Sequence, residues 1–391
     1  MRLQLSPEEE SFRQEMHTFF TTQVPESTRQ AVAAHRDLTR EQWVESQRIL
    51  NAAGLAVPHW PTEWGGRDWT PLQRHIWREE MQLASVPEPL PFNAGMIGPV
   101  LAAFGSQEQK ERFLPATANL DIWWCQGFSE PEAGSDLASL RTSARRDGDS
   151  YVVNGQKLWA SGGKHADWCL LLARTDPEAP KRKGISYFLL DMTTPGVEVR
   201  PIRNAIGDAH FCEIFLNDVE IPAANLVGVE NAGWQVAQAT LGAERGLTML
   251  ELAERLGNAG FRWLVEASPV DDPIVADRLA QFETEITGLR GLCRKVVEDN
   301  ETGTAGPADA SIVKLYYSEL LQRLTDFGAE IGGLPAHTRL AKPMSSGWES
   351  GSWMLDFIGS WEWTIPGGSS EVQRTIIGER ALGLPREPSA V

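Results

Sequence analysis

The 391-residue chain has few of the features that mark secreted, metal-binding or membrane-embedded proteins. It has only 4 cysteines, and no two of them form a Cys-x-x-Cys pair, so neither a zinc site nor a redox motif is expected. Scattered cysteines in a large chain are typical of a reduced intracellular protein. No stretch is apolar and long enough to span a membrane, and the acidic N-terminus has no apolar signal core. The sequence therefore predicts a cytoplasmic protein without a metal site or a membrane segment.

Basic residues are also scarce. The chain has 36 Lys and Arg against 53 Asp and Glu, which gives a formal net charge of −17. Such a surface repels phosphate backbones and anionic lipid headgroups, so the charge argues against nucleic acid and membrane as partners. An anionic small molecule is not excluded, because it needs only a local basic pocket.

Three regions of the chain differ in the spacing of their apolar residues. Residues 1–121 have helical spacing and begin with Ser6-Pro7 and three glutamates, a combination typical of a helix start. Residues 122–230 change to short strands spaced about ten residues apart, which favours a small barrel or sandwich. Residues 231–391 return to helical spacing. The sequence predicts an α+β protein with an N-terminal helical domain, a middle β domain and a C-terminal helical domain at these boundaries.

Two stretches of the middle region carry the chemistry. Trp124-Cys-Gln-Gly-Phe-Ser-Glu-Pro-Glu-Ala-Gly-Ser-Asp136 is an apolar strand that runs into a Gly/Ser/Asp turn, which can aim N–H and hydroxyl groups at a ligand. Asn154-Gly-Gln-Lys-Leu-Trp-Ala-Ser-Gly-Gly163 predicts a strand, an Asn-Gly hairpin turn and a second strand. Trp159 and Ser161 alternate, so they would share one face. That face suits a flat polar ring such as a flavin, although a hairpin with a core tryptophan also fits the pattern.

Together these stretches resemble the flavin-binding middle of the acyl-CoA dehydrogenase family. The Ser129-Glu-Pro…Gly134-Ser-Asp136 signature is specific, and so is the late run from Gly368-Ser-Ser-Glu-Val-Gln to Gly-Leu-Pro385. The resemblance covers nearly the whole chain. It implies the family fold, in which the C-terminal domain is a four-helix bundle. It also implies an FAD-dependent dehydrogenation of an acyl-CoA thioester between Cα and Cβ, with electrons passed to an electron-transferring flavoprotein.

The resemblance also assigns residues to the cofactor. In the middle region these are Gln126, Phe128, Ser129, Gly134, Ser135, Trp159 and Ser161; in the C-terminal region they are Glu330, Gly333, Ser369 and Glu371. Ser161 would bond near the reactive N5 of the flavin, and Ser129 near the pyrimidine end. Phe128 departs mildly from the family pattern, because a smaller aliphatic residue is usual there.

The catalytic base is the main departure. Many family members carry it in a Tyr-Glu-Gly-Thr-Ser run, where this chain has Ile365-Pro-Gly-Gly-Ser-Ser370, with Gly367 at the glutamate position. Some members place the base on a helix, at an acid before an arginine, and Glu244 followed by Arg245 matches that pattern. The resemblance makes Glu244 the base and Gly367 the source of an N–H for the thioester oxygen. Ser135, Arg245 and Gly367 would contact substrate. The alternative is that Glu244 is a surface glutamate beside Arg245.

A second departure concerns assembly. The family commonly has an Arg…Phe-Gly motif that grips the FAD of a neighbouring subunit, and residues 263–272 lack it. This loss and the relocated base resemble the actinobacterial enzymes of steroid side-chain degradation, which form α2β2 heterotetramers. The sequence therefore predicts a homo- or heterotetramer acting on a branched or bulky acyl-CoA. Two alternatives stay open: a structural subunit without turnover of its own, and a flavin oxidase or monooxygenase on the same fold.

Overall fold

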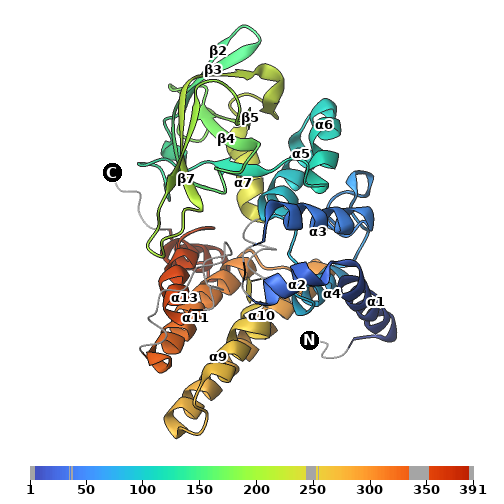
Figure 1. Ribbon diagram of the computed structural model, residues 1–391. Helices are drawn as coiled ribbons and strands as arrows, with labels where there is room; N and C mark the ends of the chain where they lie inside the picture. Colours follow the sequence, from blue (N-terminus) through green and yellow to red (C-terminus); the bar gives the residue numbers. More distant parts are fainter. Residues whose placement is uncertain are drawn as a thin grey trace. The chain divides into compact units, whose positions relative to one another are not determined.

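The computed structural model describes residues 5–34, 36, 38–243, 252–253, 255–333 and 352–386 (Figure 1). The chain divides into two compact units. A sheet unit comprises Gln47–Asp68 and Pro89–Glu244, and a helical unit comprises Met1–Ser46, Trp69–Glu88 and Arg245–Val391. Helix α3 (Arg40–Ala52) runs across the boundary between them.

The sheet unit contains an eight-stranded sheet in the order β6-β7-β3-β2-β4-β5-β8, with β1 paired to β4. The strands are β1 (Trp124–Gly127), β2 (Ser143–Asp147), β3 (Ser150–Ser161), β4 (Trp168–Arg174), β5 (Ile185–Asp191), β6 (Val197–Ile202), β7 (Phe211–Pro222) and β8 (Leu226–Val227). Six consecutive residues of β4, and six of β5, are buried. A strand covered on both faces reads as a continuous apolar run, as these two do.

The expected hairpin at Asn154-Gly155 is wrong. Strand β3 continues through both residues and pairs with β7 along its length, with a register shift between Val153 and Gly155. Asn154 is instead tied to β7, because its Nδ2 donates to Asp218 Oδ1 at 3.0 Å and its Oδ1 accepts from Asp218 N at 2.9 Å. The glycine is required by a close approach, since a Cβ at Gly155 would lie 2.4 Å from Thr142 Oγ1. The pair therefore forms a bulge within one strand.

The sheet unit also contains helices and short helical turns, which precede, separate or follow the strands along the chain. They are η1 (Thr62–Trp64), the π-helical turn η2 (Phe92–Ile97), α5 (Gly98–Phe104), α6 (Gln107–Ala118), η3 (Leu137–Ser139), η4 (Ala223–Asn225) and α7 (Gly233–Ala243). Asn93 of η2 connects them to β1: its Nδ2 donates to Ile122 O at 2.6 Å, and its Oδ1 accepts from Trp124 N at 3.3 Å. This buried amide fixes the start of β1.

The helical unit is built around two long helices, α10 (Pro273–Thr302) and α11 (Asp309–Ile331) (Figure 1). Its other elements are α1 (Pro7–Gln23), α2 (Glu26–Ala33), α4 (Pro71–Leu83), η6 (Leu256–Gly260), α9 (Phe261–Ala267), α13 (Trp353–Ser360), η7 (Trp361–Thr364), α14 (Ser370–Ile376) and η8 (Ile377–Ala381). Helix α1 starts as expected, with a capping box between Ser6 and Glu9. The core is apolar and includes Phe282, Tyr317 and Leu320.

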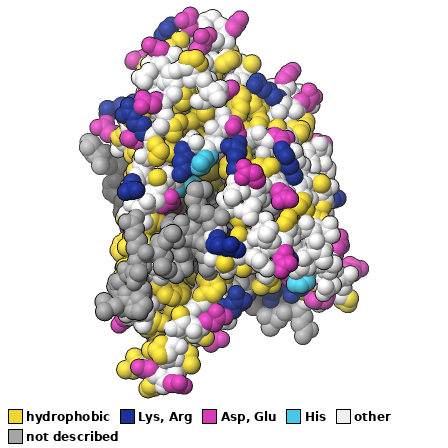
Figure 2. All heavy atoms as spheres, viewed as in Figure 1, with side chains coloured by type: hydrophobic (Ala, Val, Ile, Leu, Met, Phe, Trp, Pro, Cys, Tyr) yellow, Lys and Arg dark blue, Asp and Glu magenta, His cyan; other side chains and the backbone are white. Residues whose placement is uncertain are grey.

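The described surface mixes both charge signs, and Figure 2 shows Lys/Arg and Asp/Glu side chains interspersed over the viewed face. No helix among the described residues is long and apolar enough to cross a membrane. The same residues contain no group of three or more His, Cys, Asp or Glu side chains that could hold a metal ion.

Candidate functional site

The two stretches singled out in the middle region are joined by direct bonds. Leu158 N donates to Ser129 O at 2.9 Å, and Lys157 Nζ donates to Phe128 O at 3.1 Å. The same ammonium forms an ion pair with Glu130 Oε1 at 2.7 Å. The turn after β1 is therefore fixed to the centre of β3. We call this arrangement, residues 128–130 with residues 157–161, the turn–strand platform.

The ion pair at the centre of the platform is buried, with the side chains 0% exposed for Lys157 and 8% for Glu130. The Glu130 carboxylate also accepts from Arg141 N at 2.6 Å and Thr142 N at 2.9 Å. Burial raises the pKa of Glu130, but Lys157 and these hydrogen bonds outweigh it, so that the pKa is lowered. The carboxylate therefore stays ionised and holds three segments of chain together.

Trp159 projects from the platform towards solvent. Its side chain is 53% exposed, although large aromatic residues usually lie inside. Its backbone is left-handed, with φ of 63°, at a register shift between Lys157 and Ala160. Ala160 is buried in the sheet core, whereas the half-buried Ser161 lies two positions from the indole. An exposed ring on a strained backbone beside a hydroxyl fits the flat, polar ring of a flavin.

The other predicted cofactor residues of the middle region fall into two groups. Gly134 and Ser135 are exposed in the turn beyond Glu130, and the neighbouring Asp136 pairs with Lys181 at 2.9 Å. Gln126 is half-buried on β1. Phe128, by contrast, is buried and packs edge-on against Tyr187 at 5.8 Å. The side chain of Phe128 therefore supports the turn from inside, and the role of this residue towards the cofactor stays a prediction.

The helical unit carries a second candidate feature, the diglycine loop Gly367-Gly368. Both residues are left-handed, with φ of 67° and 104°, which glycine adopts without strain. Gln373 Nε2 donates to Gly367 O at 2.7 Å, and Lys314 Nζ donates to Gly368 O at 2.8 Å. Both donors are 0% exposed. Among the described residues, the N–H groups of Gly367 and Gly368 have no acceptor, so the loop presents two unpaired donors.

The remaining predicted cofactor residues lie in the same unit. Ser369 caps α14 by accepting from Val372 N at 3.4 Å, and the exposed Glu371 follows it. The pKa of Glu371 is lowered, first by a backbone hydrogen bond and then by the Ser369 hydroxyl. Glu330 is exposed near the end of α11, and Gly333 is left-handed, with φ of 53°. Glu244 and Arg245 lie outside the described residues, so their roles stay predictions.

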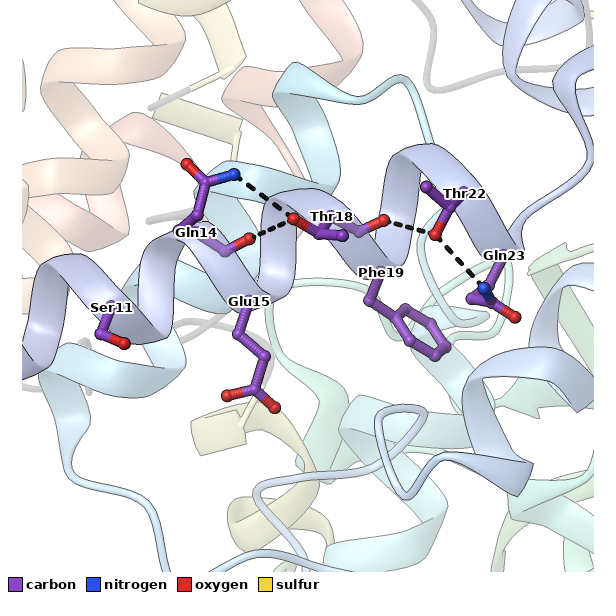
Figure 3. A pocket seen from close by; sticks show the side chains of 7 residues that line it. All are labelled: Ser11, Gln14, Glu15, Thr18, Phe19, Thr22 and Gln23. Atoms are coloured by element: carbon purple, nitrogen blue, oxygen red, sulfur yellow. Dashed lines mark hydrogen bonds between the residues drawn. The ribbon is translucent and has the colours of Figure 1, made fainter.

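Two surface hollows among the described residues lie away from the predicted site residues. One follows a single face of α1, and Figure 3 shows Gln14, Thr18, Thr22 and Gln23 of that face bonded along the helix, as in the 2.8 Å bond from Thr18 Oγ1 to Gln14 O. The other is a shallow apolar strip that includes Phe261, Val265 and Leu279. Neither hollow contains a residue that was assigned to cofactor or substrate.

Four residues of the candidate site were given no role by sequence reasoning: Glu130, Lys157, Lys314 and Gln373. Glu130 and Gln373 stand inside the two signature runs, and Lys157 stands inside the Asn154–Gly163 stretch. A charged residue within an apolar strand or helix face is the signal that could have found the two lysines, because such charges are seldom buried unless paired.

Comparison with known proteins agrees with this architecture. Three family models match the chain: Acyl-CoA dehydrogenase, N-terminal domain, over residues 6–121; middle domain, over 125–219; and C-terminal domain, over 231–382. Acyl-CoA dehydrogenase IpdE1 of Mycobacterium tuberculosis is 38% identical over 357 residues, which cover 89% of each chain. Among solved structures, the Tcur3481-Tcur3483 steroid ACAD has a TM-score of 0.85 and 29% identity, covering 99% of this chain and 100% of that one. The ChsE4-ChsE5 complex from Mycobacterium tuberculosis has a TM-score of 0.80 and 31% identity, with 99% and 100% coverage.

The chain has a helical region, then a sheet region, then a second helical region. This order and these matches define an oxidoreductase that acts on acyl thioesters. The chain belongs to the acyl-CoA dehydrogenase family. The family resemblance and the fold class expected from the sequence are thereby confirmed.

Proposed function

We propose that this acyl-CoA dehydrogenase uses FAD to oxidise a branched or bulky acyl-CoA, of the steroid side-chain type, between Cα and Cβ. The observation that carries the proposal is the exposed Trp159 beside Ser161, on a platform fixed to Ser129 by Leu158 and Lys157. The electron acceptor would be an electron-transferring flavoprotein. A cytoplasmic location stays a prediction.

The cofactor residues form two sets on the described chain. In the sheet unit, Trp159 would lie against the ring, with Ser129 and Ser161 as hydrogen-bonding groups. In the helical unit, Ser369 and Glu371 are candidates, and the buried Ser370 Oγ has no hydrogen-bond partner among the described residues. The bound FAD would supply an acceptor for a hydride.

The remaining chemistry belongs to the chain itself. Glu244, as a carboxylate, would take the proton from Cα, while the hydrogen on Cβ leaves as a hydride and a Cα=Cβ double bond forms. Negative charge builds on the thioester oxygen as the α-proton leaves, and the unpaired N–H of Gly367 would stabilise it. Ser135 and Arg245 would contact the CoA thioester.

Anaerobic addition of an acyl-CoA to the purified protein tests this function. A yellow protein whose flavin absorbance bleaches on addition is the expected result. A protein that stays colourless unless a partner chain is co-expressed would favour the structural-subunit alternative. A yellow protein that consumes oxygen rapidly with substrate would favour the oxidase.

The flavin assignment makes a prediction about Trp159. Replacing it with alanine should weaken FAD binding by about tenfold, because an aromatic contact contributes about 0.5–1.5 kcal/mol beyond the area that it buries. Trp159→Phe keeps a ring and should recover most of the affinity. Titration of the apoprotein with FAD measures both. A crystal structure with the indole and the Ser161 hydroxyl more than about 6 Å from the flavin would contradict the assignment.

The substrate class follows from the diglycine loop. Glycine at 367, where many family members carry a glutamate, removes side-chain volume beside the proposed thioester site, which would leave room for a branch or ring near Cα or Cβ. Two of the similar proteins, described as a steroid ACAD and its variant, support this class. We expect a higher kcat/KM for a branched or steroid-derived thioester than for a linear one, by about 10–200-fold for each methylene-sized group accommodated. A preference for the linear thioester would contradict the substrate class alone.

We also predict an assembly of about four chains, which is either homomeric or heteromeric. Each copy of this chain contributes 43.3 kDa to its mass. The C-terminal segments Ser352–Ile358 and Glu371–Leu382 are expected to supply the assembly surface, and Leu382, at the end of the second segment, is 68% exposed. Light scattering should show dissociation in Leu382→Lys. Ile274→Lys, at a residue 79% exposed at the start of α10, is the control and should leave the mass unchanged. A wild-type monomer with full FAD occupancy would contradict this prediction.

A further inference from the structure

We propose that Lys314 is a positioning residue of the dehydrogenation site: its buried ammonium, together with Gln373, holds the diglycine loop so that the N–H donors of the loop face the thioester oxygen. This inference rests on the proposed function, since it assumes that an acyl-CoA thioester binds at Gly367.

Lys314 lies on the inward face of α11, and its side chain is fully buried. Its Nζ donates to Gly368 O at 2.8 Å, across 54 residues of sequence. A hydrogen bond from a charged donor is stronger than one between neutral groups, and more so away from water. A buried ammonium is costly to place, and this one gives a charged donor to the Gly368 carbonyl, which restricts the orientation of that carbonyl.

Gln373 holds the same loop from α14. Its Nε2 donates to Gly367 O at 2.7 Å and approaches Gly368 O at 3.3 Å. Gly368 also has no room for a side chain, because a Cβ there would lie 2.8 Å from Gln373 Nε2. The amide and the ammonium therefore act on neighbouring carbonyls, and the loop fits closely against the amide.

The consequence for the donors follows from peptide geometry. A peptide bond is planar and trans, so its N–H points opposite to its C=O. When Gly367 O points to Gln373, the N–H of Gly368 must point away from it. The adjacent N–H of Gly367 also has no acceptor among the described residues. Gln373 therefore orients the Gly367–Gly368 peptide directly. Lys314 holds the next peptide through Gly368 O, and so limits the backbone rotation of Gly368 by which this N–H could turn. The two residues occupy acceptors of the loop and leave its donors for a ligand.

A matched control exists on the same two helices. Arg374 of α14 pairs with Glu319 of α11 at 2.5 Å, on the exposed surface. Glu319→Gln removes this contact between α11 and α14 without touching the diglycine carbonyls. Lys314→Met removes the ammonium and keeps an unbranched side chain of similar length.

The test compares two CoA ligands on the FAD-loaded enzyme in its native assembly. Cyclohex-1-ene-1-carbonyl-CoA presents a thioester oxygen and already carries the Cα=Cβ double bond that the reaction would form, whereas the thioether S-(cyclohex-1-enylmethyl)-CoA lacks that oxygen. In the wild type the thioester should bind at least about tenfold more tightly, as expected for an oxygen met by preorganised donors. In Lys314→Met that ratio should fall towards one, with thioether affinity unchanged. Glu319→Gln should keep the wild-type ratio.

Turnover gives a second readout. Because the donors contact the thioester oxygen in the bound substrate and also act on the charge that develops there in the transition state, Lys314→Met should raise KM and lower kcat, and kcat/KM should fall by about 10–100-fold. In a Lys314→Met/Gln373→Met double variant, the fold-loss of kcat should be smaller than the product of the fold-losses in the two single variants, since both residues act on one loop. If Lys314→Met does not fold, the ratio of thioester to thioether affinity is measured in Gln373→Met, which removes the other donor to the loop carbonyls.

A folded Lys314→Met enzyme that keeps the wild-type ligand ratio and kcat would overturn the inference and leave the proposed function intact. A wild type that binds neither CoA ligand would overturn both, and a wild type that oxidises acyl-CoA yet shows equal affinities would overturn the donor arrangement alone.

Discussion

Replacing Glu244 with glutamine is expected to lower turnover by about 10²–10⁴-fold, the usual cost of losing a general base. FAD should remain bound, and anaerobic addition of substrate should no longer bleach the flavin. The reason is that Gly367 stands where many relatives carry the glutamate, so no side chain at that position can take the α-proton. Glutamine keeps the size of the side chain and removes only its basicity.

The measurement is single-turnover reduction of the flavin, which separates proton abstraction from substrate binding. Glu266→Gln serves as the control, because Glu266 is exposed and pairs weakly with Arg262 at 3.7 Å. Near-normal flavin reduction in Glu244→Gln would remove Glu244 from the mechanism. The fold and the FAD proposal would be unaffected by that result.

The second large effect is expected at Lys157. Its replacement by methionine should lower the free energy of unfolding by about 3–5 kcal/mol, because the Glu130 carboxylate would be left buried without its cation. FAD affinity should fall in the same variant, since Lys157 also fixes Phe128 O within the turn–strand platform. Thermal unfolding and FAD titration measure the two losses.

Two controls separate burial of charge from loss of a contact. The double variant Lys157→Met/Glu130→Gln should regain much of the lost stability, because no unpaired charge is then buried. Arg48→Gln breaks the exposed Arg48–Asp121 pair of the same unit, 2.7 Å long, and should cost less than about 1 kcal/mol. If Lys157→Met and Arg48→Gln lowered the free energy of unfolding equally, the buried pair would contribute no more to stability than the exposed one.

The buried Lys157–Glu130 pair also determines how the stability of the protein depends on pH. A carboxyl whose pKa is lowered on folding stabilises the protein above its ordinary pKa of 4.5, and this stabilisation is lost as the pH falls through the lower folded value. The wild type should therefore lose stability below about pH 4.5 more steeply than Glu130→Gln. Unfolding midpoints measured from pH 7 to pH 3 would show whether the two curves converge in acid.

Local pattern was sufficient for much of the fold. Apolar runs that follow Gly184 and Pro195-Gly196 predict strands at Ile185–Asp191 and Val197–Ile202, and the structure has both strands at these residues. The Asn154-Gly155 hairpin was wrong for a reason that lies elsewhere in the chain. Asn154 is bonded to Asp218, 64 residues away, and Gly155 packs against Thr142. An Asn-Gly pair has the same local preference in a turn and in this bulge, so tertiary pairing decides between them.

The candidate site shows the same division. The signature runs identified Ser129, Trp159 and Ser161 as a group, and the platform brings their segments together. The supporting residues were not foreseen, because their partners are distant: Lys157 meets Glu130 across 27 residues, and Lys314 meets Gly368 across 54. A single sequence shows that a lysine stands in an apolar segment, but not which carbonyl or carboxylate it meets.

The left-handed backbone at Gly367 constrains how this enzyme could change. A glutamate introduced there would adopt φ of 67°, a conformation that costs an L-amino acid about 1–2 kcal/mol. A single substitution that restores the carboxylate of the more common family run at this position would therefore cost stability unless the loop conformation changed as well. If Glu244 is the base, as proposed, then exchanging it for a base on the loop would require a change in backbone as well as in side chain.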